Sequence, residues 1–248
     1  MKTKISWLVM VMVLLIACNQ TPPENSKPEY TIIEQSKIIG DTNFFSIDLQ
    51  YPSFVASKNN SNSNLETLNK SMETFLDTAS RYFWGTDTEG ARKTIQETGS
   101  QGKYELMNRY EILSKDVSLI SVKFETYSYA LGAHGFTALT TYNFDVKSGN
   151  FLKLTDLVNL DTPGNLQTLN NLLLKHFENP VNCFDKEPAV TADWAKFGKE
   201  PSNLVFYFEA YELGPYSCGA ATIKIPIIAL KEAGIWKWKE NLEESKTS

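Results

Sequence analysis

The sequence predicts an α+β fold in which one or two antiparallel sheets carry two principal helices. Two stretches place apolar side chains at the spacing of one helix face, whereas most other ordered stretches alternate apolar and polar residues, as half-buried strands do. The order of these stretches is strands, helix, strands, hairpin, helix and strands, which lacks the strict strand–helix alternation of a parallel sheet. A single sheet bearing both helices and a pair of sub-domains both fit the 248-residue chain.

The N-terminal part of the folded region is expected to begin at Tyr30. Two strands are predicted, at Tyr30–Ile39 and Phe45–Tyr51, and the second alternates clearly between apolar and polar residues. Ser63 and Glu66 have the spacing of a capping box, which predicts that the first helix begins there. The side chains that recur at helical spacing and should form its buried face are Leu65, Leu68, Met72, Phe75, Leu76, Ala79 and Phe83.

The middle of the chain is predicted to be rich in strands. The polar, glycine-containing stretch Gly85–Gly102 is expected to be a loop. Turns are predicted at Leu131–Gly135 and Lys147–Asn150, because glycines interrupt the alternating pattern there. The segments predicted as strands are Tyr104–Ile112, Val117–Ala130, Ala138–Val146 and Phe151–Leu154.

The C-terminal part is predicted to contain the second principal helix and two further strands. Thr162, followed directly by proline, is typical of a helix N-cap. Residues 179–202 are expected to be irregular, and strands are predicted at Leu204–Leu213 and 221–227, followed by a short helix near Leu230. The side chains expected on the buried face of the second helix are Leu166, Leu169, Leu172, Leu173 and Phe177.

The first residues have the parts of a bacterial secretion signal. Lys2 and Lys4 give a positive start, and Trp7–Ala17 is an unbroken apolar run that is too short for a comfortable membrane span. The run ends at Cys18 in a sequence that resembles the lipobox, in which a peptidase cuts before a lipidated cysteine. We therefore expect a lipid anchor on Cys18 that attaches the protein to a membrane of the cell envelope. An ordinary secretion signal with a chance cysteine is the alternative. Asn19 favours the outer membrane in a two-membrane cell.

The predicted domain organisation has five parts. Residues 1–17 are the lipoprotein signal peptide, and residues 18–29 are a tether rich in Pro, Asn and Ser. Two α+β domains follow at 30–138 and 139–240, and residues 241–248 form a tail. After the anchor the chain is expected to be soluble.

Charge and cysteine content restrict the partners. The 24 basic residues are outnumbered by 29 acidic ones, and removal of the two signal lysines would leave a net charge near −7. Such acidity argues against a nucleic-acid partner and would suit a cationic protein. With Cys18 lipidated, Cys183 and Cys218 remain as an even pair in an oxidising compartment, which predicts one disulfide. Two buried free thiols are the alternative, and a zinc site is disfavoured because no histidines lie at ligand spacing.

Two stretches carry a resemblance to a known family. Tyr127–Leu157 contains Gly132-Ala133-His134-Gly135 and Tyr142-Asn143-Phe144-Asp145, and Val205–Ile227 contains Tyr211-Glu212-Leu213, Pro215-Tyr216 and Ile225-Pro226. In this order and spacing they resemble the paired extracellular domains of PdaC-type peptidoglycan deacetylases and of the lysozyme-sensing anti-sigma factor RsiV. The resemblance covers most of residues 30–238, and the residues before Leu119 match in pattern only.

The resemblance implies a sensor or accessory module and not an enzyme. PdaC-type enzymes have a separate deacetylase domain with metal-binding Asp and His residues, which nothing in this sequence resembles, and no cofactor is expected. RsiV-like proteins have a cytoplasmic segment, which a lipobox would exclude. We therefore expect a non-catalytic envelope protein that binds peptidoglycan, another glycan or a lysozyme-like protein. The alternatives are an envelope glycan hydrolase that uses His134 and nearby acids, and a dedicated lysozyme inhibitor.

Six residues are candidates for ligand contact: His134, Tyr142, Asp145, Tyr207, Tyr211 and Tyr216. His134 lies between two glycines, so a structural role in a sharp turn competes with ligand contact and with catalysis beside Tyr142 or Asp145. Exposed aromatic faces bind sugars and anchor protein interfaces, although core packing is the competing interpretation. Asp145 is also expected to cap the turn that follows it, and Asp145 with Asp156 lacks the further oxygen ligands of a metal site.

Overall fold

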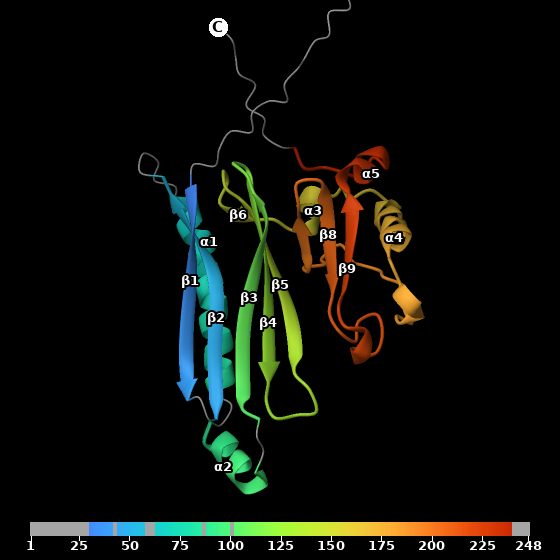
Figure 1. Ribbon diagram of the computed structural model, residues 1–248. Coiled ribbons are helices and arrows are strands. Elements are labelled where there is room, and N and C mark those ends of the chain that lie inside the picture. Colours follow the sequence, from blue (N-terminus) through green and yellow to red (C-terminus); the bar gives the residue numbers. More distant parts are fainter. Residues whose placement is uncertain (1–29, 42–43, 58–62, 86–87, 100–101, 240–248) are drawn as a thin grey trace, which may run out of the picture.

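The computed structural model describes residues 30–41, 44–57, 63–85, 88–99 and 102–239, which form two β-sheets accompanied by helices (Figure 1). The mixed α+β class is therefore confirmed. The predicted signal peptide, the lipidation site Cys18, the tether and the tail lie outside the described residues. Within the described ranges, no helix is long and apolar enough to cross a membrane.

The first sheet contains six strands whose order in the sheet follows the chain. Neighbouring strands are antiparallel except for the second and third, which are parallel, so the expectation of antiparallel sheets holds with one exception. The strands are β1 (Tyr30–Asp41), β2 (Phe45–Ala56), β3 (Tyr104–Lys115), β4 (Leu119–Tyr129), β5 (Phe136–Asp145) and β6 (Asn150–Phe151).

The parallel pair follows from the connection between β2 and β3. Two helices, α1 (Ser63–Gly85) and α2 (Thr88–Thr98), link these strands, and parallel neighbours need a long crossover of this kind. The predicted start of the first helix at Ser63 is confirmed. The predicted loop at Gly85–Gly102 is wrong, because it contains α2. Ile95 is the one large apolar side chain of this helix, so it lacks the apolar stripe that identifies a helix in sequence.

Helix α1 packs on one face of the six-stranded sheet, as predicted. Its Asn69 accepts a hydrogen bond from the backbone N–H of Phe54 at 2.9 Å and donates one to the carbonyl oxygen of Phe54 at 2.8 Å. Because β2 pairs with β3 only over Phe45–Leu49, this amide satisfies the backbone where β3 no longer does. The stripe residues that are at most 2% exposed are Leu65, Leu68, Met72 and Leu76.

The second sheet has three antiparallel strands, β7 (Phe197–Lys199), β8 (Asn203–Phe208) and β9 (Ala221–Pro226). Helices α4 (Asn165–His176) and α5 (Ile227–Glu232) contact β9 and help to close a second core. The remaining short elements are α3 (Leu154–Leu157) and the 3₁₀ helices η1 (Pro180–Asn182) and η2 (Tyr216–Cys218).

Three features of this second part differ from the sequence prediction. The second helix is present as α4, but its N-cap is Gly164, at φ 90°, and not Thr162. Strand β7 lies in the segment predicted to be irregular, because three residues are too few to show a period. Strand β8 ends at Phe208 and not at Leu213, since the chain turns away where Tyr211 adopts a positive φ.

The boundary between the two sheets lies after Phe151. Strand β5 pairs with β4 from Phe136 to Asp145, and β6 then adds to the same sheet. The predicted domain division between residues 138 and 139 therefore falls inside β5.

The two sheets meet through a buried polar seam. Ser121 on β4 donates a hydrogen bond to the side chain of Asn143 on β5 at 2.7 Å, and Asn143 donates to the carbonyl oxygen of Phe197 at 2.8 Å. The backbone N–H of Lys199 completes the seam by donating to Ser121 Oγ at 3.1 Å. Beside it, an apolar cluster spans both sheets and consists of Leu113, Leu139, Val205 and Tyr207.

Candidate functional site

Two loops from different sheets bring three of the predicted residues together. The β4–β5 loop carries His134, and the segment after β8 carries Tyr211 and Tyr216. The His134 ring stacks on the Tyr216 ring with centroids 3.7 Å apart and planes 19° apart, and His134 Nε2 lies 3.0 Å from the Tyr211 hydroxyl. We call these three residues the tip cluster; its loops lie at the lower end of both sheets in Figure 1.

Backbone contacts hold the imidazole of His134 in one orientation. His134 Nδ1 lies 2.9 Å from the carbonyl oxygen of Gly135, and the Tyr216 hydroxyl donates to the same oxygen at 2.8 Å. The tautomer with hydrogen on Nδ1 satisfies both ring contacts, because Nε2 can then accept from Tyr211. A Cβ added to Gly135 would lie 2.2 Å from the ring of Tyr127, so glycine is needed for this ring to pack under the loop.

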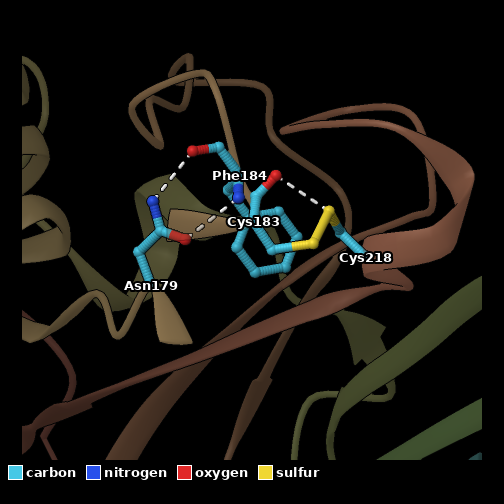
Figure 2. The surroundings of a disulfide bond; sticks show 4 residues. All are labelled: Asn179, Cys183, Phe184 and Cys218. Atoms are coloured by element: carbon cyan, nitrogen blue, oxygen red, sulfur yellow. Dashed lines mark hydrogen bonds between the residues drawn. A yellow bond between two sulfur atoms is a disulfide. The ribbon is translucent and has the colours of Figure 1, made fainter. Parts of the chain in front are cut away.

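The disulfide predicted between Cys183 and Cys218 is present (Figure 2). Cys218 comes two residues after Tyr216, so the bond ties the tyrosine segment to the loop that follows α4. Figure 2 shows that the Asn179 side chain donates a hydrogen bond to the carbonyl oxygen of Phe184 at 2.8 Å and accepts one from its backbone N–H at 2.9 Å. The disulfide joins the two loops, and the Asn179 hydrogen bonds stabilise the loop that carries Cys183.

Backbone strain is concentrated in the same loops. Within the described residues, the non-glycine residues with positive φ are Leu131, Val181, Asn182 and Tyr211. Leu131 lies in the β4–β5 loop, Val181 and Asn182 directly precede Cys183, and Tyr211 belongs to the tip cluster. A left-handed conformation costs roughly 1–2 kcal/mol at such a residue, and strain of this kind gathers at functional sites.

Two of the strained residues expose large side chains. Tyr211 is 52% exposed, and the aliphatic side chain of Val181 is 95% exposed. The part of an apolar side chain that stays in contact with water contributes no burial energy to the fold. They are available for contact with another molecule.

The acids near the tip cluster are engaged in holding its loop. Glu209 accepts a hydrogen bond from the backbone N–H of Leu139 at 2.7 Å and pairs with Lys196 at 3.2 Å. Glu212 pairs with the same lysine and accepts from the backbone N–H of Glu209. None of the described carboxylates hydrogen-bonds to His134, whose ring nitrogens contact Tyr211 and Gly135.

Three of the six predicted residues lie away from the tip cluster. Tyr142 packs in the first core against Phe124, and burial raises its pKa to about 12. Tyr207 is 3% exposed in the junction between the sheets, where burial raises its pKa. Asp145 caps the β5–β6 turn as predicted, accepting from the N–H of Lys147 at 2.9 Å.

Two family profiles match successive parts of the chain. The family described as "Deacetylase PdaC" matches residues 38–137, and the family described as "Protein of unknown function (DUF3298)" matches residues 159–227. The chain contains a PdaC domain followed by a DUF3298 domain. The predicted resemblance is therefore confirmed at the level of domains. The tip cluster is shared between them, since His134 belongs to the PdaC domain and both tyrosines belong to the DUF3298 domain.

Comparisons with whole proteins agree with this assignment. The chain is 22% identical over 218 residues to the peptidoglycan-N-acetylmuramic acid deacetylase PdaC of Bacillus subtilis (strain 168), a match that spans 82% of this chain and 42% of that enzyme. The chain thus corresponds to less than half of the length of this relative.

Two solved structures of DUF3298 proteins share the fold. The one from Bacteroides fragilis NCTC 9343 has a TM-score of 0.62 and 18% identity, covering 83% of this chain and 94% of that one. The one from Pseudomonas aeruginosa PAO1 has a TM-score of 0.53 and 14% identity, covering 86% and 96%.

Two residues near the tip cluster were not among the candidates named from the sequence. Tyr127 was noted only as the first residue of a family-like stretch, and Val181 lay in the segment expected to be irregular. The one feature of the sequence that could have pointed to Val181 is its position two residues before Cys183. The described residues also contain no group of three or more His, Cys, Asp or Glu side chains that could hold a metal ion.

Proposed function

We propose that this protein is a lipid-anchored, non-catalytic binding protein of the cell envelope, and that its tip cluster recognises a lysozyme-like protein that attacks the cell wall. The observation that supports this most strongly is the exposure of Tyr211 and Val181 on loops whose strained backbone is held by a disulfide. A surface that is stiff before binding loses less entropy on association.

The form and charge of the surface favour a protein partner. Tyrosines and outward-facing aliphatic groups act as anchors in the centre of protein interfaces. The chain has a net charge of −5, which would speed its encounter with a basic protein such as a lysozyme. Peptidoglycan, named in the description of the Bacillus relative, is the alternative ligand of this surface.

The surroundings of His134 support binding and not hydrolysis. A general base needs an orienting acid within hydrogen-bond reach, and His134 instead contacts a tyrosine hydroxyl and a backbone carbonyl. The acid considered from the sequence, Asp145, lies at the other end of β5, about 30 Å away for a ten-residue strand.

Calorimetric titration of the full-length protein, purified in detergent, tests the proposal. Lysozyme should bind with a Kd of about 1 μM or lower, and Tyr211→Ala should weaken binding at least about tenfold by removing an exposed anchor. Ile228→Ala on α5, which removes a side chain that is 61% exposed away from the tip, should bind as the wild type does.

Soluble peptidoglycan fragments form the second arm of the titration. If lysozyme gives no heat at about 100 μM, the lysozyme assignment is wrong. Binding of the fragments that is lost in Tyr211→Ala would then assign the tip cluster to glycan.

A further inference from the structure

An open cleft lies at the opposite end of β5 from the tip cluster. Its volume is about 530 Å³, within the range of small-molecule sites. The β5–β6 turn forms one wall, α3 a second, and the chain after α5 a third, so segments distant in sequence create it together. The residues that line it are Asp145, Ser148, Asn150, Phe151, Leu152, Asp156, Lys237 and Trp238.

The lining combines aromatic rings with mixed polar groups. Phe151 is 41% exposed, and Trp238 contributes a second ring. Around these rings stand two carboxylates, an ammonium group, an amide and a hydroxyl. Aromatic faces stack against the C–H faces of pyranose rings, while the polar groups can exchange hydrogen bonds with sugar hydroxyls.

Part of this polar capacity is not used by the protein itself. Asp156 accepts the backbone N–H of Lys153 through Oδ2 at 2.7 Å, and its Oδ1 accepts no hydrogen bond from the described residues. Lys237 Nζ donates one hydrogen bond, to the carbonyl oxygen of Thr155 at 3.2 Å, and an ammonium group can donate three. An acceptor and a donor therefore remain on opposite chain segments of the cleft.

Backbone hydrogen bonds hold the walls in place. The N–H of Leu152 donates to the carbonyl oxygen of Asn143 at 2.7 Å, which fixes the chain after β6. The N–H groups of Lys237 and Trp238 both donate to the carbonyl oxygen of Leu157, at 2.8 and 3.2 Å. The cleft is thus formed before any ligand arrives, which lowers the entropy lost on binding.

We propose that this cleft is a binding subsite for a short saccharide of one or two pyranose rings. The sugar lies against Phe151 and Trp238, and its hydroxyl groups bond to Asp156, Lys237 and Asn150. This inference goes beyond the proposed function, because it concerns a separate surface and does not require the tip cluster. A protein with both would hold a wall glycan at one end of β5 and a protein at the other.

Saturation-transfer NMR of the full-length protein with N,N′-diacetylchitobiose tests the subsite. We expect a Kd of roughly 0.1–10 mM, as suits a small open site. The double variant Asn150→Ala with Lys237→Ala removes exposed donors that support no core, and should weaken binding at least about fivefold. Trp238→Ala should abolish binding, with circular dichroism confirming that the variant is folded.

Ile38→Ala is the matched control, since it removes a side chain that is 77% exposed on β1, at the sheet edge opposite β6, and should bind the disaccharide as the wild type does. Absence of saturation transfer at about 10 mM, or equal affinity in the wild type and the double variant, would overturn the inference. Loss of disaccharide binding in Tyr211→Ala alone would overturn it too, by placing the sugar at the tip. Lysozyme titration of the same variants keeps the two proposals distinguishable.

Discussion

Gly135 shows how one residue determines the geometry of the tip cluster. Its missing side chain makes room for the ring of Tyr127, and its carbonyl oxygen accepts from Tyr216. Gly135→Ala would place a Cβ 2.2 Å from that ring, so the ring or the loop must shift. We expect a loss of about 1–3 kcal/mol in the free energy of unfolding, measured in urea.

Gly132 in the same loop provides the matched control. A Cβ there would meet only the carbonyl oxygen of His134, at 3.9 Å. Gly132→Ala should therefore change stability by no more than about 0.5 kcal/mol. Equal effects of the two substitutions would show that the packing of Tyr127 on Gly135 does not govern the loop.

The candidate tyrosines illustrate what sequence can say of a single residue. Tyr142 and Tyr211 both lie in segments that the sequence predicts as strands, yet one is packed on Phe124 and the other is 52% exposed. Exposure depends on what covers a residue from elsewhere in the chain. The sequence could therefore list aromatic candidates for ligand contact, but it could not separate the buried tyrosines from the exposed ones.

At the scale of elements, the Cys183–Cys218 disulfide joins two loops that no strand pairing connects among the described residues. Replacing Cys183 and Cys218 by serine should lower the free energy of unfolding by up to about 4 kcal/mol, because the bond closes a loop with a sequence separation of 35. The double variant should also bind lysozyme at least about tenfold more weakly, since the strained loops are no longer held.

Urea unfolding and calorimetry measure these two effects. Adding a reductant to the wild type should move its unfolding midpoint to that of the double variant and leave the variant itself unchanged. An unaltered midpoint with unaltered lysozyme binding would contradict a positioning role for the bond.

The elements themselves were predictable where their pattern was long. Strands β2 to β5 and helices α1 and α4 each repeat a period several times, so their positions were found from the sequence. Helix α2, with Ile95 as its one large apolar side chain, and strand β7, with three residues, have no repeat to detect. The place of α2 depends on the crossover between the parallel strands β2 and β3. The place of β7 depends on its pairing with β8.

At the scale of the whole molecule, the seam between the sheets joins the PdaC and DUF3298 domains. Asn143→Ala would leave the Ser121 hydroxyl and the carbonyl oxygen of Phe197 without their buried partner. We expect a loss of about 2–4 kcal/mol in the free energy of unfolding, measured in urea, because unsatisfied buried groups cost about 1–3 kcal/mol each.

Thr141 on the same strand is the control for the seam. It also bonds across the junction, to the carbonyl oxygen of Ala195 at 2.9 Å, but in an exposed position where water can replace it. Thr141→Ala should cost no more than about 1 kcal/mol. A small effect at Asn143 would show that the apolar cluster alone joins the sheets.

The proposed lipid anchor on Cys18 also belongs to the scale of the whole molecule. Cys18→Ser should move the protein from the membrane fraction to the soluble fraction, because lipidation requires the thiol. Cys183→Ser should stay with the membrane, since its sulfur serves the disulfide. Immunoblotting of separated fractions measures both, and a Cys18→Ser protein that still sediments with membranes would refute the anchor.

The sequence by itself determined the α+β class and the two principal helices, and it predicted one disulfide and a resemblance to the PdaC family, because each leaves a local pattern or a short motif. Only the tertiary structure decided that His134 meets Tyr211 and Tyr216, that Tyr142 and Tyr207 are covered, and that Asp145 stands by a separate cleft. These outcomes depend on contacts between different segments of the chain, such as the His134–Tyr211 contact across 77 residues. Periodicity reports which face of an element is buried, whereas the identity of the neighbour that covers it is set by how the elements pack.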